Sequence, residues 1–222
     1  MKYFAIITGG GIGSRMQESI PKQFLLLQGI PIIMHTIRHF QLLTDTIFVT
    51  LPKQWFGYWQ ELQEEYGFNI PHVIIEGGNT RFESVKNAIS HLPEEGFVAI
   101  HDAVRPFVRS SFIQACFEHA ESHGSAVMVA PVKDSLRMIS GARTKAVDRN
   151  DFFAVQTPQV FPCEIIKKAY QQSFQSCFTD DATVVETLGY DIELVSSNEL
   201  NLKITTKEDL LLAEYIFQLI NH

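Results

Sequence analysis

Short apolar, β-branched runs alternate along the chain with longer stretches whose apolar positions have helical spacing. Five such runs predict strands, at residues 5–8, 46–51, 73–76, 98–101 and 126–131. The stretches between them predict helices near residues 31–40, 54–66, 80–91 and 110–123. Strands that alternate with helices are typical of βαβ units. We therefore expect an α/β fold with a Rossmann-like, mostly parallel sheet covered by helices on both faces.

The last part of the chain has the clearest helical pattern. Thr206 can cap a helix that begins there. The apolar positions expected on one face of this helix are Leu212, Ala213, Ile216, Leu219 and Ile220. We expect this helix to close the core.

Residues 133–152 interrupt the pattern, because they combine few large apolar side chains with several charges. Such a segment does not predict a buried strand. Two extended pieces around Ser140 and Gly141 predict a protruding hairpin, or β-arm. Composition alone favours a simple surface excursion over an arm for dimerisation. With no linker, repeat or low-complexity tract elsewhere, residues 1–222 are predicted to form a single domain that includes this arm.

Composition excludes several classes of protein. The chain has 222 residues with 45% hydrophobic residues and a formal net charge of −7, which indicates a sizeable core and argues against a broad basic surface for nucleic acid. Its three cysteines, Cys116, Cys163 and Cys177, lack the spacing of a metal site or disulfide framework. The apolar run at residues 4–7 is too short for a signal peptide, and no stretch is long enough to cross a membrane. We expect a cytoplasmic location.

A glycine-rich loop directly follows the first predicted strand, where open α/β sheets bind ligands. Glycine lets backbone N–H groups approach a phosphate closely. The loop lacks the third glycine of a dinucleotide fingerprint and the Gly-Lys-Ser/Thr of a Walker loop. It carries its own cation, Arg15, and Lys22 follows soon after. The residues allow either a phosphate-binding loop or a purely structural turn.

Further polar clusters lie at or just after predicted strand ends. Gly78, Asn79 and Ser84 open a predicted helix and could read the edge of a nucleotide base, although the same residues also suit an ordinary helix start. Asp102 and Arg105 suit a magnesium or hydroxyl contact beside a phosphate clamp, or simply a local ion pair. These clusters support the interpretation of the glycine-rich loop as part of a ligand site.

The motifs, taken in order, resemble those of the 2-C-methyl-D-erythritol 4-phosphate cytidylyltransferases of isoprenoid-precursor synthesis. The resemblance covers essentially the whole chain and rests on GGGxGxRM, PKQ, GGxxRxxSV, HDAVRP, VDR, QTPQxF, TDDA, NxKIT and EDLLLAE. The ribitol 5-phosphate cytidylyltransferases share several of these motifs and are the alternative. Residues 147–150 and 179–182 are more similar to the methylerythritol enzymes. The chain departs from the family's pattern at ITGGG and at Ser135, where Thr is more usual.

The resemblance implies a nucleotide-diphospho-sugar-transferase-like fold and transfer of CMP from CTP to 2-C-methyl-D-erythritol 4-phosphate, with release of pyrophosphate. It implies catalytic roles for Arg15, Lys22 and Lys203. Implied CTP-binding residues are Gly9, Gly10, Gly11, Gly13, Gly78, Asn79, Arg81, Ser84, Asp102 and Ala103. Implied acceptor-binding residues are Asp102, Arg105, Ser135, Arg149 and Thr157.

The same resemblance implies a cofactor and a partner subunit. Mg²⁺ would be held mainly by the CTP phosphates, with Asp102 as the candidate protein ligand. Ser135 and Arg149 would reach the acceptor from the arm of a second subunit, which makes the expected protein a homodimer. Under this resemblance the segment 133–152 is a dimerisation arm rather than a surface excursion.

Two further patterns do not indicate sites. His35 and His39 lie four residues apart, but Thr36 stands where a zinc-protease helix has its Glu, so we interpret them as ordinary helix surface. The aromatic residues Trp55, Phe56, Tyr58 and Trp59 have helical spacing, which favours helix packing over a platform for stacking bases.

Overall fold

The computed structural model describes residues 1–10, 20–197 and 200–220. Within these residues the main sheet has seven strands in the order β11-β7-β10-β6-β1-β4-β5. The strands are β1 (Tyr3–Thr8), β4 (Thr46–Leu51), β5 (Val73–Glu76), β6 (Phe97–Asp102), β7 (Ala126–Pro131), β10 (Phe153–Pro162) and β11 (Leu194–Ser196). All five predicted strands form, and the prediction of a mostly parallel sheet is confirmed.

Strand β10 was not predicted, and it runs antiparallel between β6 and β7. Proline inside an apolar run usually argues against a central strand, because it has no N–H for the ladder. Here the pairing of β10 with β7 shifts register between Val155 and Gln159, so that Pro158 falls in the irregular part. A bulge thus lets this segment cross the middle of the sheet.

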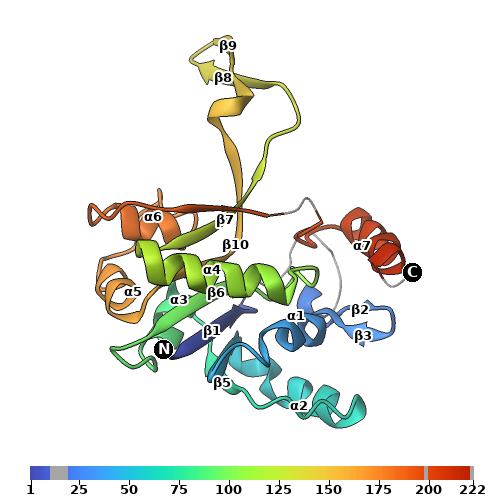
Figure 1. The fold of residues 1–222 in the computed structure, drawn as a ribbon. Coiled ribbons are helices and arrows are strands. Elements are labelled where there is room, and N and C mark those ends of the chain that lie inside the picture. Colours follow the sequence, from blue (N-terminus) through green and yellow to red (C-terminus); the bar gives the residue numbers. More distant parts are fainter. Residues whose placement is uncertain (11–19, 198–199, 221–222) are drawn as a thin grey trace.

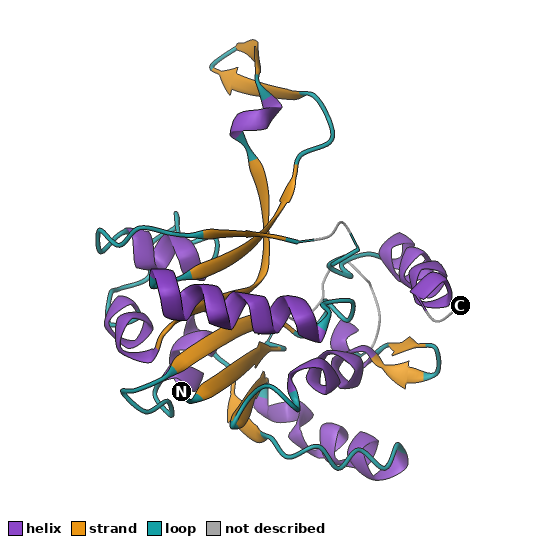
Figure 2. Ribbon diagram, in the orientation of Figure 1, coloured by secondary structure: helices purple, strands orange, loops and turns teal. Residues whose placement is uncertain are grey.

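Helices cover both faces of the sheet, as predicted (Figures 1 and 2). Their bounds are α1 (Ile32–Phe40), α2 (Phe56–Glu65), α3 (Arg81–Ile89), α4 (Ser110–His123), α5 (Cys163–Ala169), α6 (Asp181–Glu186) and α7 (Lys207–Ile220). Successive strand residues point to opposite faces, so Ala5 and Ile7 join the core under α1, α2 and α4, while Phe4 and Ile6 join the core under α3, α5 and α6. The sheet is therefore buried on both sides.

The final helix differs from its prediction. Of its residues only Ala213 and Ile216 are buried, while Leu212, Leu219 and Ile220 are exposed. The helix packs on a small separate cluster around Leu27, from the hairpin of β2 (Leu26–Leu27) and β3 (Ile30–Pro31). Nearly every position from 210 to 220 is apolar, so the sequence does not define a single buried stripe. The expectation that α7 closes the main core is wrong.

A two-stranded hairpin projects from the sheet (Figure 1). It consists of β8 (Leu136–Ser140) and β9 (Arg143–Val147), which pair antiparallel and are almost entirely exposed. Gly141 lies in the turn with φ of +59°, a conformation that side chains disfavour. A short 3₁₀ helix, η3 (Arg149–Asp151), then leads into β10. Among the described residues, no helix is long and apolar enough to cross a membrane.

Candidate active site

A cavity of about 550 Å³ lies beside the carboxyl end of β6 and is also lined by residues of β10, α6 and β11. Parallel strands bring their carboxyl ends to one edge, which is where α/β sheets bind ligands. Many of the described residues that line the cavity are polar or charged, among them Arg81, Asp102, Arg105, Thr157 and Lys203. The structure thus brings together four elements that are far apart in sequence.

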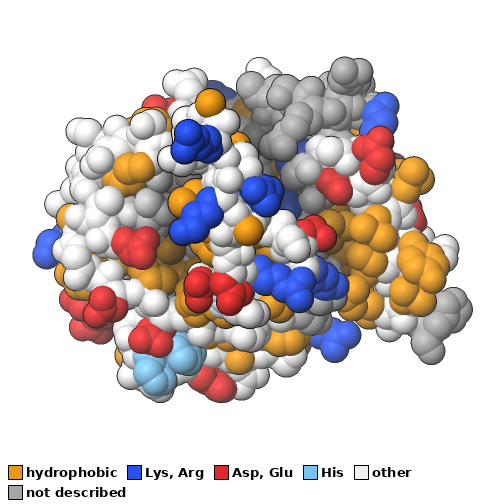
Figure 3. Space-filling view, turned by 90° about the horizontal axis from the view of Figure 1, so that it is seen from above, with side chains coloured by type: hydrophobic (Ala, Val, Ile, Leu, Met, Phe, Trp, Pro, Cys, Tyr) orange, Lys and Arg blue, Asp and Glu red, His pale blue; other side chains and the backbone are white. Residues whose placement is uncertain are grey.

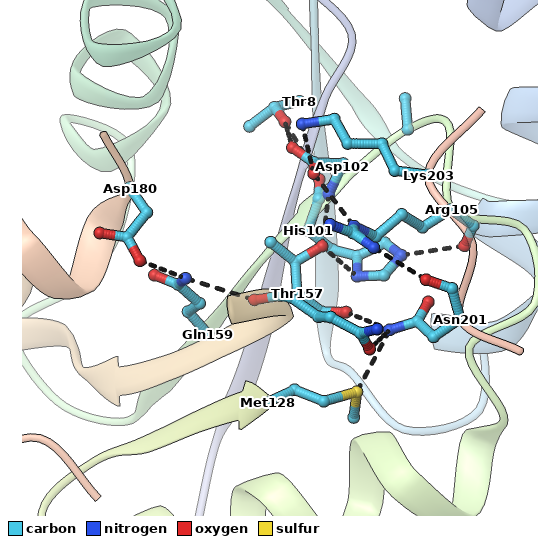
Figure 4. A network of polar contacts seen from close by, with 12 residues as sticks. Thr8, His101, Asp102, Arg105, Met128, Thr157, Gln159, Asp180, Asn201 and Lys203 are labelled. Carbon is cyan, nitrogen blue, oxygen red and sulfur yellow. Dashed lines mark hydrogen bonds and ion pairs between the residues drawn. The ribbon is translucent and has the colours of Figure 1, made fainter. Parts of the chain in front are cut away.

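Asp102 lies at the centre of a cluster of cations (Figure 4). Lys203 Nζ lies 2.9 Å and Arg105 Nε 3.2 Å from its Oδ2 atom, and Arg81 Nε lies 3.5 Å from its Oδ1 atom. Burial alone would raise the pKa of Asp102, but the charges of these three residues outweigh it and hold that pKa well below its usual range. Asp102 is therefore ionised at neutral pH.

Arg81 is committed to a second buried carboxylate. Its Nη1 and Nη2 atoms donate to the two oxygens of Asp181 over 2.9 and 2.7 Å, and Asp181 is 0% exposed. Tyr170 Oη donates to Asp181 over 2.5 Å. Sequence reasoning expected Arg81 at CTP and gave Asp181 no role, although both stand in quoted motifs. The guanidinium lies between two carboxylates, and Arg81 also lines the cavity, so its contact with CTP stays a prediction.

A chain of hydrogen bonds links the backbone of Asp102 to Thr157 and His101. His101 Nε2 lies 3.1 Å from the carbonyl of Arg105, so we assign the ring proton to Nε2 and leave Nδ1 as an acceptor for the Thr157 hydroxyl, 3.1 Å away. That hydroxyl accepts from the Asp102 N–H over 3.1 Å. Burial lowers the pKa of His101 to about 3, so the ring is neutral and cannot act as a base near pH 7.

The described part of the glycine loop is tightly packed. Gly9 N–H donates to the Thr50 carbonyl over 3.0 Å, and Gln23 Nε2 donates to the Gly9 carbonyl over 2.5 Å. A Cβ on Gly10 would lie 2.6 Å from Ser84 Oγ, so a side chain does not fit there without a shift. Gly11, Gly13 and Arg15 lie outside the described residues. Lys22 opens the short helix η1 (Lys22–Phe24) and is partly buried.

The loop predicted to read the base packs against the start of α3. Gly78 N–H donates to Ser84 Oγ over 3.0 Å, and that hydroxyl donates to the Thr80 carbonyl over 2.9 Å. The Ser84 hydroxyl thus holds the loop in shape, while the side chain of Asn79 is exposed. A Cβ on Gly78 would lie 2.2 Å from Glu83 Cβ. Glycine is required here by close packing rather than by a positive φ.

Two predicted acceptor-binding residues are not at the cavity. Ser135 and Arg149 are exposed at the base of the hairpin, and neither lines the cavity of its own chain. Arg149 donates to the carbonyl of Lys133. The structure therefore brings Asp102, Arg105 and Thr157 together but leaves Ser135 and Arg149 apart from them.

The two patterns set aside at first have structural roles. His35 and His39 each place Nε2 2.9 Å from a backbone carbonyl, of Leu27 and Pro106 respectively. Both are largely buried, so the interpretation as helix surface is wrong for them. Helix packing is confirmed for the aromatic stretch, since Trp59 is buried against Phe24 and its neighbours pack on the same core.

Sequence reasoning missed several residues that shape the site. Gln159 donates to Asp180 over 3.0 Å and accepts from Ala182 N–H over 2.8 Å, which ties β10 to the start of α6. Asn201 donates to the Thr157 carbonyl over 2.8 Å. Both residues stand in quoted motifs, but no local pattern distinguishes a buried amide that joins two elements from a solvated one.

Comparisons with known proteins agree with this geometry. The family model for 2-C-methyl-D-erythritol 4-phosphate cytidylyltransferase, IspD, matches residues 3–219. An enzyme of that name from Bacteroides thetaiotaomicron is 43% identical over 212 residues, covering 95% of this chain and 97% of the relative. One from Porphyromonas gingivalis is 43% identical, with 97% of each chain covered.

Solved structures show the same arrangement. The crystal structure of the cytidylyltransferase from Thermus thermophilus is similar with a TM-score of 0.78 and 30% identity, covering 98% of this chain and 100% of that one. These relatives are named for the methylerythritol substrate rather than for ribitol phosphate. The chain therefore belongs to the 2-C-methyl-D-erythritol 4-phosphate cytidylyltransferase family, a family of nucleotidyltransferase enzymes.

Proposed function

We propose that this chain transfers CMP from CTP to 2-C-methyl-D-erythritol 4-phosphate and releases pyrophosphate, acting as a cytoplasmic homodimer with Mg²⁺. The observation that supports this most strongly is the cluster of Arg81, Arg105 and Lys203 on Asp102 in the cavity. Asp181 balances Arg81, so Asp102 alone faces two further cations. The excess positive charge suits two anionic substrates that must approach each other.

The chemistry needs no general base from the protein. A phosphate monoester has a second pKa of about 6 and is mostly dianionic at pH 7. Its oxygen attacks the α-phosphorus of CTP, a new P–O bond forms, and the bond to the leaving pyrophosphate breaks. The neutral ring of His101 agrees with a mechanism that depends on placement and charge.

Different cations bind the two substrates in this proposal. Lys203, Arg105 and Thr157 all line the cavity, and we assign Lys203 and Arg105 to the acceptor phosphate. Lys22 and Arg15 are assigned to the triphosphate, whose negative charge is redistributed as pyrophosphate leaves. Positive groups fixed before the reaction stabilise that charge without reorganising.

Magnesium fits this site as an ion bound mainly by CTP. Among the described residues no group of three ligating side chains could hold a metal ion. Asp102 is ionised and lines the cavity, and Mg²⁺ is commonly held by one or two carboxylates together with substrate phosphates. When bound, the ion would neutralise part of the triphosphate charge.

The arm is assigned to the site of a second subunit. Ser135 and Arg149 do not line the cavity of their own chain. The arm and its base also expose several large apolar side chains, namely Met138, Ile139, Phe152, Phe153 and Val155. Exposed apolar clusters mark interaction surfaces, and a second copy would cover this one.

The direct test is to incubate the protein with CTP, Mg²⁺ and methylerythritol phosphate and to follow pyrophosphate. Parallel reactions replace the acceptor by ribitol 5-phosphate, and CTP by ATP, GTP or UTP. We expect turnover only with CTP and methylerythritol phosphate. Equal rates with all four nucleotides would contradict the cytidylyl assignment, and preference for ribitol 5-phosphate would contradict the acceptor.

A further inference from the structure

Asn201 lies two residues before Lys203, in the irregular segment between β11 and α7. Its side chain is directed into the protein, and the residue is 2% exposed, whereas the side chain of Lys203 is 40% exposed. Residues 201–205 form no helix or strand that would hold Lys203 in place. Its position must come from the tertiary contacts of its neighbours.

The contacts of Asn201 reach two other parts of the site (Figure 4). Its Nδ2 donates to the Thr157 carbonyl over 2.8 Å and to Gln156 Oε1 over 3.1 Å, both on β10. Its backbone carbonyl accepts from Arg105 Nη1 over 2.8 Å. One residue therefore touches Thr157 and Arg105 and lies on the same segment as Lys203.

The orientation of the Asn201 amide is determined by these acceptors. Turning the amide over would place Oδ1 against the Thr157 carbonyl and Gln156 Oε1, which are acceptors themselves. In the described structure Oδ1 is buried without a hydrogen-bond partner. A buried orphan acceptor is unfavourable, so the contacts of Nδ2 must outweigh it.

Buried residues anchor the chain on both sides of Lys203: Asn201 before it and Ile204 after it. Ile204 is fully buried, and its N–H donates to the Val104 carbonyl over 2.9 Å. Lys203 is thus held between two buried residues, one on each side, and its Nζ reaches Asp102. The Ile204 anchor is apolar and backbone-based, whereas the Asn201 anchor depends on a side-chain amide.

We propose that Asn201 is a positioning residue for the acceptor phosphate. It fixes Lys203 and the Arg105 guanidinium relative to Thr157, so that one phosphate can meet all three. This inference rests on the proposed function, because the acceptor is the substrate whose phosphate these groups would hold. Misplacing a binding group by about 1 Å can lower a rate by about a hundredfold.

The variant that tests this is Asn201→Leu, which keeps the approximate size of the side chain and removes its donors. We expect kcat/KM for methylerythritol phosphate to fall by between ~10-fold and ~100-fold, while the KM for CTP changes by less than about threefold. A matched control is Ile166→Val, a fully buried core change on α5 away from the cavity, which should leave both constants near wild type. Unchanged kcat/KM in Asn201→Leu would overturn the proposal.

A double-mutant cycle separates positioning from general damage. If Asn201 acts partly through Lys203 and partly through Arg105, adding Asn201→Leu to Lys203→Ala should cost clearly less than Asn201→Leu costs in the wild type. The same loss in both backgrounds would overturn the proposal. Should Asn201→Leu fail to fold by circular dichroism, Asn201→Ser, which can still donate one hydrogen bond, replaces it in the cycle. A wild-type protein without cytidylyl transfer would instead contradict the proposed function.

Discussion

The cluster around Asp102 and the projecting hairpin carry the two parts of the proposed site, and they differ in almost every physical respect. Asp102 is buried, and both its oxygens lie within ion-pair distance of cations. The hairpin is exposed along nearly its whole length, with Ile139 76% exposed. One chain by itself therefore orders the buried cluster around Asp102 but leaves most of the hairpin's surface exposed.

Burial explains why the first half can stand alone. Charges that are removed from water interact more strongly, and strand ends and helix starts hold them in place. A lone two-stranded hairpin gains little from its own pairing and is at best marginally stable in water. The apolar side chains on the hairpin would gain free energy only against another surface.

Asp102→Asn is the variant that we expect to destabilise the buried cluster most. This change leaves Arg105 and Lys203 close together without their shared anion, and breaking a buried pair typically costs about 3–5 kcal/mol. We expect the free energy of unfolding, from urea titration, to fall by an amount in that range. Asp134→Asn, on the exposed segment before β8, is the control and should change it by less than about 0.5 kcal/mol. A loss below about 1 kcal/mol for Asp102→Asn would mean that the cluster is not mutually stabilising.

The pH dependence of the unfolding free energy, measured for wild type and Asp102→Asn, tests the depressed pKa of Asp102. The folded-state pKa of Asp102 is depressed, so its contribution to stability is present above the unfolded value of about 4 and is lost as pH falls below it. The difference in unfolding free energy between wild type and Asp102→Asn should be constant from pH 8 to pH 5. It should shrink below about pH 4. A difference that instead disappeared between pH 8 and pH 5 would contradict the depressed pKa.

Lys203→Ala tests whether the buried half acts in catalysis. Loss of one preorganised positive group should lower kcat by about 100-fold to 1,000-fold. Lys53→Ala removes a lysine that is 76% exposed and serves as the control, with kcat expected near wild type. Pyrophosphate release at saturating substrate measures both. If only the KM for the acceptor rose, Lys203 would bind the ground state and the transition state equally.

Arg149→Ala tests the exposed half. A guanidinium can clamp a phosphate through two hydrogen bonds, so we expect the KM for methylerythritol phosphate to rise by about 10-fold to 100-fold and the KM for CTP to stay near wild type. Arg143→Ala, on β9 of the same hairpin, is the matched control. A larger effect on CTP than on the acceptor would assign Arg149 to the other substrate.

Mixing Arg149→Ala with Lys22→Ala tests whether the arm acts between subunits. If each site combines Lys22 of one chain with Arg149 of the other, a heterodimer has one intact site and one doubly damaged site. Activity should then recover well above that of either parent once subunits exchange. Confirmed heterodimers without recovery would place both residues in one subunit's site.

Gly78→Ala is expected to have the smallest of these effects and tests whether the loop before α3 binds CTP. The added Cβ would lie 2.2 Å from Glu83 Cβ, so the loop must move, and the KM for CTP should rise by about tenfold. Gly57→Ala is an informative control, because Gly57 lies inside α2 with open space around its Cβ position. That variant should be more stable by about 0.5–1 kcal/mol with unchanged kinetics. Equal kinetics for the two variants would mean that the Gly78 loop does not bind CTP.

Local sequence patterns were sufficient to predict most helices and strands and to indicate the family. Strands at 46–51, 73–76 and 126–131 and the helix at 110–123 form at the predicted bounds, because alternation and helical spacing are properties of neighbouring residues. The motif order indicated the methylerythritol enzymes before any geometry was known, and the comparisons confirmed that family.

Only the tertiary structure decided which residues meet. Arg81 and Asp181 are 100 residues apart in the chain, and neither motif predicts a buried bidentate pair. The antiparallel course of β10, the exposed face of α7 and the amide contacts of Asn201 likewise depend on surfaces contributed by distant segments. A local pattern shows that a residue is apolar or polar, but its burial and its partners depend on the packing of the whole sheet.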